Sequence, residues 1–294
     1  MTGFILGIDG GGTSCRAALA DGRGRLLGRG KSGASNILTD PDTALKHIGE
    51  AAEHAFADAG IEPDLASTSA ILGLAGNNVG DVVGYVTARL PFKRSEIVSD
   101  GVIALQGAIG DEDGAIGIVG TGTVYIIRQN GLFKSIAGWG FQVSDLGSGA
   151  RLGQLALQET LLAFDRIRPM TPLCEAILSG FDNNPELIVD FARLAKPGEF
   201  GRYTPKVFEF ADRGDETALR ILRTGAAGID EALDAVEAVT GGQGMLCLLG
   251  GLATLYPPHL AERHRTRLSA PRADALTGAV QLAVKAYGHA EVRA

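Results

Sequence analysis

The residues best suited to chemistry stand in a glycine-rich segment near the start of the chain. The short apolar run 4–8 ends at Asp9, and Gly11, Gly12 and Thr13 follow closely. Glycine reaches positive φ at little cost and lets a ligand approach bare backbone N–H groups. A carboxylate beside them can hold a divalent cation. Together these residues suit the phosphates of a nucleotide, although one glycine-rich hairpin by itself is more often only a turn.

The same pattern returns in the middle of the chain. Residues 116–123 (IGIVGTGT) repeat residues 6–13 (LGIDGGGT) as strand, glycine turn and strand, and the second turn contains Thr121, Gly122 and Thr123. A dipeptide that favours a tight turn closes each unit. Two such units facing each other would hold one phosphate chain from both sides, so the repeat strengthens the nucleotide hypothesis.

Two polar residues in the first third of the chain are candidates for binding a second substrate. Asp100 follows the expected strand 96–99, and ligands of open α/β sheets bind beyond the carboxyl ends of the strands. A helix N-cap explains this aspartate equally well. Asn36 closes the polar loop 31–36. Taken alone it is best explained as a turn residue, with a hydrogen bond to a sugar as the sharper alternative.

The only tryptophan lies in a loop-like segment of the second half. Trp139 stands between Gly138 and Gly140, and Asp145 follows a few residues later. A single tryptophan usually belongs to a core, but glycines on both sides are typical of a ligand-binding loop. The segment is therefore a second candidate for substrate binding.

A glycine pair follows the expected strand 245–249. Gly250 and Gly251 lead from this strand into residues with helical character. A flat nucleotide base could lie there against bare backbone, and a purely structural strand-to-helix junction is an equally good explanation.

Composition limits the classes of protein to consider. The chain has 294 residues, 45% of them hydrophobic and 21% charged, and a formal net charge of −7. The length favours two domains, and the charge argues against nucleic acid or an anionic membrane as partner. Cys15, Cys174 and Cys247 are far apart, so neither a disulfide framework nor a zinc site is indicated. With no signal peptide and no apolar stretch of about 20 residues, we expect a cytoplasmic protein.

Hydrophobic periodicity predicts helices that alternate with strands after two opening hairpin units. Residues 1–110 read as βββαβαβ, which indicates an α/β fold. We expect a domain 1–110, with the C-terminal segment 280–294 packing back on it, and a second domain 111–279. The expected helices are 41–59, 79–90, 102–109, 150–165, 218–239 and 274–287. The segment 169–216, broken by proline and glycine, indicates only short helices of unknown role.

The order of these motifs is that of the actin-like, hexokinase and heat-shock ATPase superfamily. Within it the chain resembles the N-acetylglucosamine kinases and the wider BadF/BadG/BcrA/BcrD ATPase group over essentially its whole length. The likeness to bacterial glucosamine kinases is carried by Gly7–Arg16, Lys31–Ile37, 167–174 and 200–205. The resemblance implies two actin-like (ribonuclease H-like) domains, each a mixed sheet with an opening β-hairpin unit and flanking helices, and a cleft between them.

The resemblance also implies roles for single residues. ATP and Mg²⁺ would be bound by Asp9, Gly11, Gly12, Thr13, Thr121, Gly122, Thr123, Gly250 and Gly251, with Asp9 nearest the metal. The sugar would be bound by Asn36, Asp100, Gly138, Trp139, Gly140 and Asp145. This reverses the turn interpretation of Asn36. Asp100 would be the catalytic base, taking the proton of the sugar 6-hydroxyl as that oxygen attacks the γ-phosphate.

The sugar and two other classes of function stay open. The Gly-Trp-Gly segment is more like that of N-acetylglucosamine kinases, since an indole suits an acetyl methyl, whereas the other motifs are more like those of glucosamine kinases. Another hexose, such as N-acetylmuramic acid, is a further alternative. An activator ATPase of a dehydratase or reductase needs a cysteine pair for an iron–sulfur cluster, which the cysteine spacing does not favour. A non-catalytic sugar-sensing regulator usually adds a DNA-binding helix-turn-helix, for which we see no room. Only the family suggests a homodimer.

Overall fold

The computed structural model describes residues 3–77 and 81–288. It divides into two compact units, with the chain crossing from the first to the second at 112/113 and returning at 270/271. The boundaries expected from the sequence were 110/111 and 279/280, and as an assignment of domains they stay a prediction. Residues 289–294 of the expected C-terminal segment, and residues 79 and 80 of the expected helix 79–90, lie outside the described residues.

The first unit is built on a five-stranded mixed sheet of order β3-β2-β1-β4-β5. Its strands are β1 (Ile5–Gly10), β2 (Cys15–Ala20), β3 (Leu26–Ser32), β4 (Ser69–Leu74) and β5 (Arg94–Ser99). The first three pair antiparallel, whereas β1, β4 and β5 run parallel. Gly10 pairs with Leu74, and Leu74 with Ser99, so the three parallel strands end together at one sheet edge.

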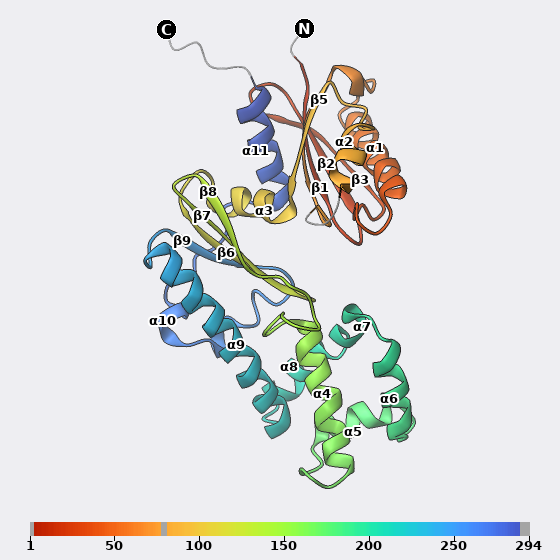
Figure 1. Ribbon diagram of the computed structural model, residues 1–294, viewed down its shortest axis with the longest axis vertical. Helices are drawn as coiled ribbons and strands as arrows, with labels where there is room; N and C mark the ends of the chain where they lie inside the picture. The colour runs from red at the N-terminus through yellow and green to blue at the C-terminus, as the bar shows by residue number, and fades with distance from the viewer. Residues whose placement is uncertain (1–2, 78–80, 289–294) are drawn as a thin grey trace. The chain divides into compact units, whose positions relative to one another are not determined.

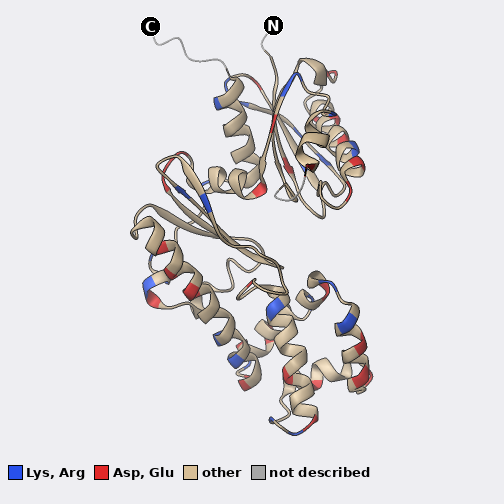
Figure 2. Ribbon diagram, in the orientation of Figure 1, with Lys and Arg blue, Asp and Glu red and all other residues tan. Residues whose placement is uncertain are grey.

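Helices cover both faces of this sheet (Figure 1). They are α1 (Pro41–Asp58), the short η1 (Leu65–Ser67), α2 (Val82–Thr87), α3 (Asp100–Ile109) and α11 (Ala275–Tyr287). Side chains alternate along β1: Leu6 and Ile8 pack with the apolar face of α1, whereas Ile5 packs with Ile103 and Ala279 on the other side. Figure 2 shows Lys, Asp and Glu along α1, whose buried side chains are all apolar.

Close approach of α11 depends on a glycine in β1. A Cβ at Gly7 would lie 2.4 Å from the backbone nitrogen of Val280. Any larger residue would push the helix off the sheet. The C-terminal helix is therefore an integral layer of the first unit.

The second unit is built on a four-stranded sheet of order β8-β7-β6-β9. Its strands are β6 (Gly114–Val119), β7 (Thr123–Gln129), β8 (Leu132–Ala137) and β9 (Met245–Leu249). Strands β6, β7 and β8 form an antiparallel meander, and β9 pairs parallel with β6. The second unit thus repeats the opening of the first, as the repeated sequence predicts.

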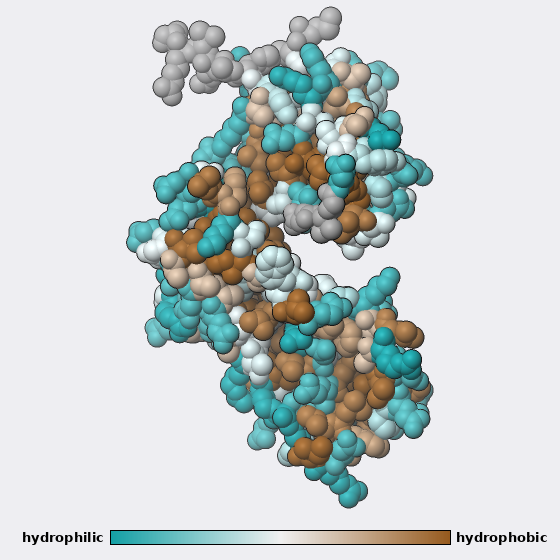
Figure 3. Space-filling view, viewed as in Figure 1, coloured by the Kyte–Doolittle hydropathy of each residue, from teal (hydrophilic) through white to brown (hydrophobic). Residues whose placement is uncertain are grey.

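The second unit carries more helices than the first. They are α4 (Gly149–Phe164), α5 (Pro172–Ser179), α6 (Pro185–Leu194), α7 (Pro197–Gly201), α8 (Thr204–Asp212), α9 (Glu216–Thr240), η2 (Pro257–His259) and α10 (Glu262–Arg265). Helix α9 contacts β7 and β8 and shares one large core with α4, α5 and α8. Figure 3 shows brown, apolar side chains over the part with α5 and α6, where Leu187, Val189 and Leu194 are exposed. No helix in the described ranges is long and apolar enough to cross a membrane.

Candidate active site

The first glycine turn leaves room for a ligand over its backbone. The Gly11 N–H donates to the Ser14 carbonyl at 3.0 Å, and the Ser35 N–H donates to the Gly11 carbonyl at 2.8 Å. A Cβ on Gly12 would meet no atom within 4 Å. Among the described residues, none accepts a hydrogen bond from the N–H of Gly12 or Thr13. Both groups are therefore open to an anion such as a phosphate.

Asp9 is held by an arginine from the neighbouring strand. Its carboxylate forms an ion pair with Arg16, its register partner on β2, and the other guanidinium nitrogen lies 3.8 Å from Asp274, the N-cap of α11. An oxygen ligand at this position fits Mg²⁺. Sequence reasoning missed Arg16 as a site residue. The signal that could have found it is the antiparallel register of the hairpin, which places Asp9 opposite Arg16.

Asn36 uses one end of its side chain within the protein. Its Oδ1 accepts hydrogen bonds from the N–H groups of Leu38, at 3.0 Å, and Thr39, at 3.2 Å. The Ile37 N–H donates to the carbonyl of Ala75, just beyond β4, and so ties this loop to the sheet edge. In the described part of the chain the side-chain NH₂ has no partner. A ligand hydroxyl could accept from it.

Asp100 begins α3 at the edge where the parallel strands end. The helix N-cap is Ser99, whose hydroxyl accepts the Val102 N–H at 3.2 Å, so capping does not account for Asp100. One carboxylate oxygen of Asp100 accepts the Gly101 N–H at 2.9 Å. The side chain reaches solvent, yet partial burial among nearby protein atoms raises its pKa, the negative charge of Asp9 raises it further, and the Gly101 bond opposes the rise. A raised pKa makes the carboxylate a stronger proton acceptor.

The second glycine turn is fixed against the start of a helix. The Gly149 N–H donates to the Gly120 carbonyl at 2.8 Å, and the Ala150 N–H donates to the Thr121 carbonyl at 3.2 Å. The N-terminus of α4 is therefore next to this turn. The first four N–H groups of α4 all have acceptors within the protein, so only the dipole of α4 would favour an anion at this end of the helix.

Asp145 lies against this second turn. It is 5% exposed and has a φ of 63°. Its Oδ1 accepts the Thr123 N–H at 3.3 Å, and a Cβ on Gly122 would lie 2.9 Å from its Oδ2. Burial raises its pKa, whereas the Thr123 bond and the charge of Arg151 lower it. Asp145 thus connects the loop 138–145 to the turn expected to bind phosphate.

Trp139 presents its indole to solvent. It is 81% exposed, and the flanking Gly138 and Gly140 have φ values of 78° and 92°. Phe141 anchors the loop, with its ring centroid 5.1 Å from that of Phe200. An aromatic side chain with this exposure, held on a loop with an anchored base, is suited to contact a ligand.

A cavity of about 480 Å³ opens in the second unit beside the second glycine turn. Gly251 lines it, whereas Gly250 is needed for packing, since a Cβ there would lie 2.4 Å from the Val119 carbonyl, which also accepts the Leu252 N–H at 3.1 Å. The volume is typical of a small-molecule site. The remaining lining comes from Gly120, Thr121, Gly149, Gly198, Gly201, Arg202, Thr204, Pro205, Phe208, Leu252 and Leu255. A larger cavity of about 650 Å³, next to α3 and α11 in the first unit, contains none of the predicted site residues.

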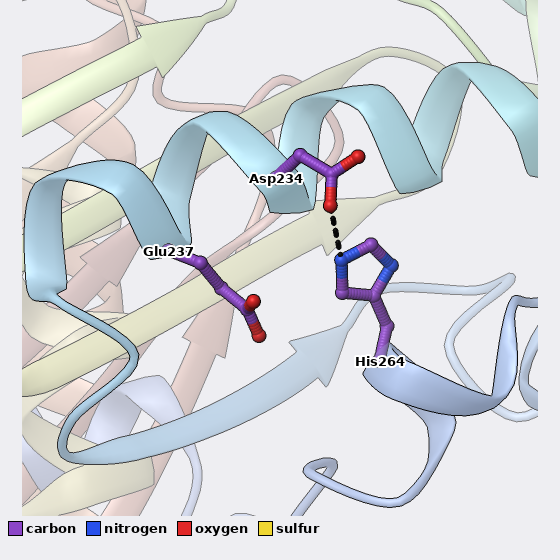
Figure 4. Close-up of side chains that lie close together, drawn as sticks. All are labelled: Asp234, Glu237 and His264. Carbon is purple, nitrogen blue, oxygen red and sulfur yellow. Dashed lines mark hydrogen bonds and ion pairs between the residues drawn. The ribbon is translucent and has the colours of Figure 1, made fainter.

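One cluster of metal-binding side-chain types lies apart from these segments (Figure 4). Asp234 and Glu237 on α9 face His264 on α10, whose fully buried ring has a carboxylate at each nitrogen. Arg263 binds both oxygens of Asp234, and Arg267 lies 2.6 Å from Glu237. Because both ring nitrogens of His264 are already occupied and each of the two carboxylates has an arginine, an ion network that joins α10 to α9 explains the cluster better than a metal site.

The structure brings the predicted residues together within each unit. In the first unit, one sheet edge gathers Asp9, Gly11, Gly12, Thr13, Asn36 and Asp100. In the second unit, one turn and its surroundings gather Thr121, Gly122, Thr123, Asp145 and Gly251. The role of each residue stays a prediction.

The chain matches known proteins along most of its length. The model of the BadF/BadG/BcrA/BcrD ATPase family matches residues 6–264. The chain is 34% identical to the glucosamine kinase GspK of Vibrio cholerae serotype O1, over 96% of each chain. It is 28% identical to the N-acetyl-D-glucosamine kinase of Dictyostelium discoideum, over 79% of each chain.

Solved structures with the same fold include kinases. A Chromobacterium violaceum protein provisionally described as an N-acetylglucosamine kinase superposes with a TM-score of 0.87 at 29% identity, over 96% of this chain and 99% of the other. A ROK family glucokinase from Streptomyces griseus, solved with glucose and AMPPNP, has a TM-score of 0.56 at 18% identity, over 96% of this chain and 98% of the other, and therefore shows the fold alone. These likenesses confirm the predicted two-sheet α/β fold. The chain belongs to the BadF/BadG/BcrA/BcrD ATPase family.

Proposed function

We propose that this protein is a kinase that transfers the γ-phosphoryl group of ATP to the 6-hydroxyl of an amino sugar, either glucosamine or N-acetylglucosamine. The observation that carries the proposal is the sheet edge of the first unit. An open glycine turn, the free amide of Asn36 and the basic carboxylate of Asp100 stand there together. The sugar-kinase names of the curated relatives support the same activity.

The chain's own residues would do three kinds of work. Asp100 takes the proton of the attacking hydroxyl, which is worth roughly 10²–10⁴-fold in rate. Backbone N–H groups of Gly12 and Thr13 donate to the phosphate oxygens, and Asn36 orients the sugar. Because phosphoryl transfer needs little covalent help from the protein, positioning and charge neutralisation dominate. Mg²⁺, which Asp9 fits as a ligand, neutralises phosphate charge when bound.

The second unit supplies the other nucleotide-binding residues and a sugar-binding loop. We assign phosphate binding to Thr121, Gly122 and Thr123, and the nucleoside to the cavity at Gly251. Trp139 and Asp145, with the glycines beside the tryptophan, would bind the sugar. An exposed indole favours the N-acetyl group, since the acetyl methyl can pack on its face. The 34% identical relative is named a glucosamine kinase, so both sugars are candidates.

A screen of ADP release with Mg·ATP tests this proposal. The sugars are glucosamine, N-acetylglucosamine, glucose and N-acetylmuramic acid, with a reaction lacking sugar as the blank. We expect one amino sugar to stimulate release strongly, and phosphorus NMR to show a 6-phosphate product. Release that is indifferent to every sugar would contradict the proposal and favour an activator ATPase. Against that alternative, Cys15, Cys174 and Cys247 are each buried as free thiols.

We further propose that the enzyme acts in the cytoplasm, since its proposed substrates are small molecules and ATP is present there. We also propose a homodimer, which only the family suggests. Cell fractionation checks the first statement. Light scattering of the purified protein checks the second, and a monomeric mass would contradict it.

A further inference from the structure

The cavity of the second unit has one polar wall and one largely apolar wall. The second glycine turn and the start of α4 form the first wall, through Gly120, Thr121 and Gly149. Residues from α8 and the segment after β9 form the apolar wall: Pro205, Phe208, Leu252 and Leu255. A nucleotide whose phosphates lie at the turn would place its base against this apolar wall.

Side chains that could read the edge of a base are scarce in this lining. It contains no Asn, Gln, Asp, Glu, Ser, His or Tyr among the described residues; its polar side chains are those of Thr121, Thr204 and Arg202. The Thr204 hydroxyl is committed, because it donates to the Gly149 carbonyl at 2.6 Å. Thr121 belongs to the turn expected to hold phosphate. Arg202 is therefore the one remaining polar side chain in the described lining.

Arg202 is free to meet a ligand. It is the C-cap residue of the short helix α7, and its backbone is fixed by a hydrogen bond from its N–H to the Glu199 carbonyl at 3.3 Å. Its side chain is exposed, and within the described chain its guanidinium has no hydrogen-bond or ion-pair partner. A planar guanidinium stacks on the face of an aromatic ring, and this contact does not distinguish one purine from another.

We propose that Arg202 stacks on the purine of the nucleotide and that the kinase therefore accepts purine nucleoside triphosphates with little distinction between adenine and guanine. The inference rests on the proposed kinase activity. A site built to hydrogen-bond a particular substrate group rejects an analogue lacking it by about 10⁴–10⁵, whereas an apolar pocket discriminates far less, by roughly 10–200-fold. A lining without edge-reading side chains belongs to the second kind.

The test compares ATP, GTP, ITP and CTP as phosphoryl donors at a saturating level of the preferred amino sugar. We expect kcat/KM for the three purine nucleotides to differ by less than about 200-fold, and CTP, with a smaller ring, to be the poorest. Loss of stacking in Arg202→Gln should raise KM for every purine donor by a similar factor, roughly 2–30-fold, and leave the sugar KM unchanged. Arg202→Lys should recover only part of this loss, since an ammonium cannot stack as a plane.

Arg223→Gln is the matched control, because Arg223 is an exposed arginine on α9 that lines a different hollow. It should change none of these constants. A preference for ATP over GTP greater than about 200-fold would overturn the inference, because backbone groups would then be reading the base edge. An unchanged nucleotide KM in Arg202→Gln would overturn it as well. Both results leave the kinase intact, whereas failure of the proposed function would appear as no sugar phosphorylation with any nucleotide.

Discussion

At the scale of single residues, the candidate site contains side chains that use only part of their hydrogen-bonding capacity within the protein. The Asn36 side-chain oxygen accepts hydrogen bonds from two backbone N–H groups, and its NH₂ has no partner among the described residues. One carboxylate oxygen of Asp100 accepts the Gly101 N–H, and the other is left for a ligand. Such partial engagement fixes the orientation of a group before the substrate arrives, which is the general condition for precise positioning.

Asn36→Asp and Asn36→Ala separate the structural and the sugar-binding roles of this side chain. The aspartate keeps an acceptor for the Leu38 and Thr39 N–H groups and lacks the NH₂. It should leave the free energy of unfolding nearly unchanged and raise the sugar KM by roughly 3- to 10-fold. The alanine should raise the sugar KM and also lower the free energy of unfolding by about 1 kcal/mol. Steady-state kinetics and urea unfolding measure both quantities, and a wild-type sugar KM in Asn36→Asp would remove Asn36 from the sugar site.

The pKa of Asp100 can be followed by carboxyl ¹³C NMR. It should titrate above an ordinary aspartate, because burial disfavours its charged form and Asp9 repels it. A base works only when ionised, so kcat/KM should fall as the pH drops through this raised pKa.

In Asp9→Asn the pKa of Asp100 should decrease and still stay above that of an ordinary aspartate, since burial remains. Asp21 is the internal control: the Arg25 N–H chiefly holds its pKa low, and it should not respond. No change at Asp100 would show that the two carboxylates do not interact.

At the scale of elements, the sequence predicts the parts that depend on local pattern. Both hairpin units, their glycine turns and the long amphipathic helix α9 follow from alternation and helical spacing. Helices α5 to α8 are expected from the sequence only as short helices without bounds, because each is brief and has a proline in its first turn. A cluster with Phe181, Phe191, Phe200 and Tyr203 packs them together. Helical spacing predicts short helices, but it does not show which of them pack together. For that reason Arg202 and the wall of the cavity could not be placed from sequence.

The contact between helix and sheet in the first unit leads us to expect opposite changes in the free energy of unfolding when two glycines are replaced. Gly7→Ala places a Cβ against the backbone of α11 and should lower the free energy of unfolding by about 1–3 kcal/mol. Gly49 lies in α1, and a Cβ added there would meet no atom within 4 Å, so Gly49→Ala should raise the free energy of unfolding by about 0.5–1 kcal/mol. Urea unfolding compares the two. Equal midpoints would refute the close approach of α11 to β1.

At the scale of the whole molecule, the connection between units decides which part can fold alone. The second unit is one continuous segment, whereas the first needs both 1–112 and the segment that begins at 271. Sequence placed this second crossing later, at 279/280. The small residues of the expected helix 274–287 suit close packing against the first domain, yet they do not indicate which strand the helix approaches. That choice depends on Gly7, which is distant in sequence and admits α11.

Fragments test this dependence. Residues 113–270 expressed alone should give dispersed NMR signals and a cooperative thermal transition. Residues 1–112 alone should not, because Ile5, Ile71 and Ile103 would lose their cover from α11. Joining residues 271–294 to the N-terminus of 1–112 through a flexible linker should restore folding. A cooperative transition in 1–112 alone would show that α11 is dispensable.

The most direct test of the central claim is the turnover of Asp100→Asn with Mg·ATP and the preferred amino sugar, alongside calorimetric titration of the sugar. Asp190→Asn, at an exposed surface ion pair, is the matched control. We predict that Asp100→Asn binds the sugar with near-normal affinity and loses roughly 10²–10⁴-fold in kcat, while the control keeps both. Retained turnover in Asp100→Asn would contradict the assignment of Asp100 as the base that activates the sugar hydroxyl.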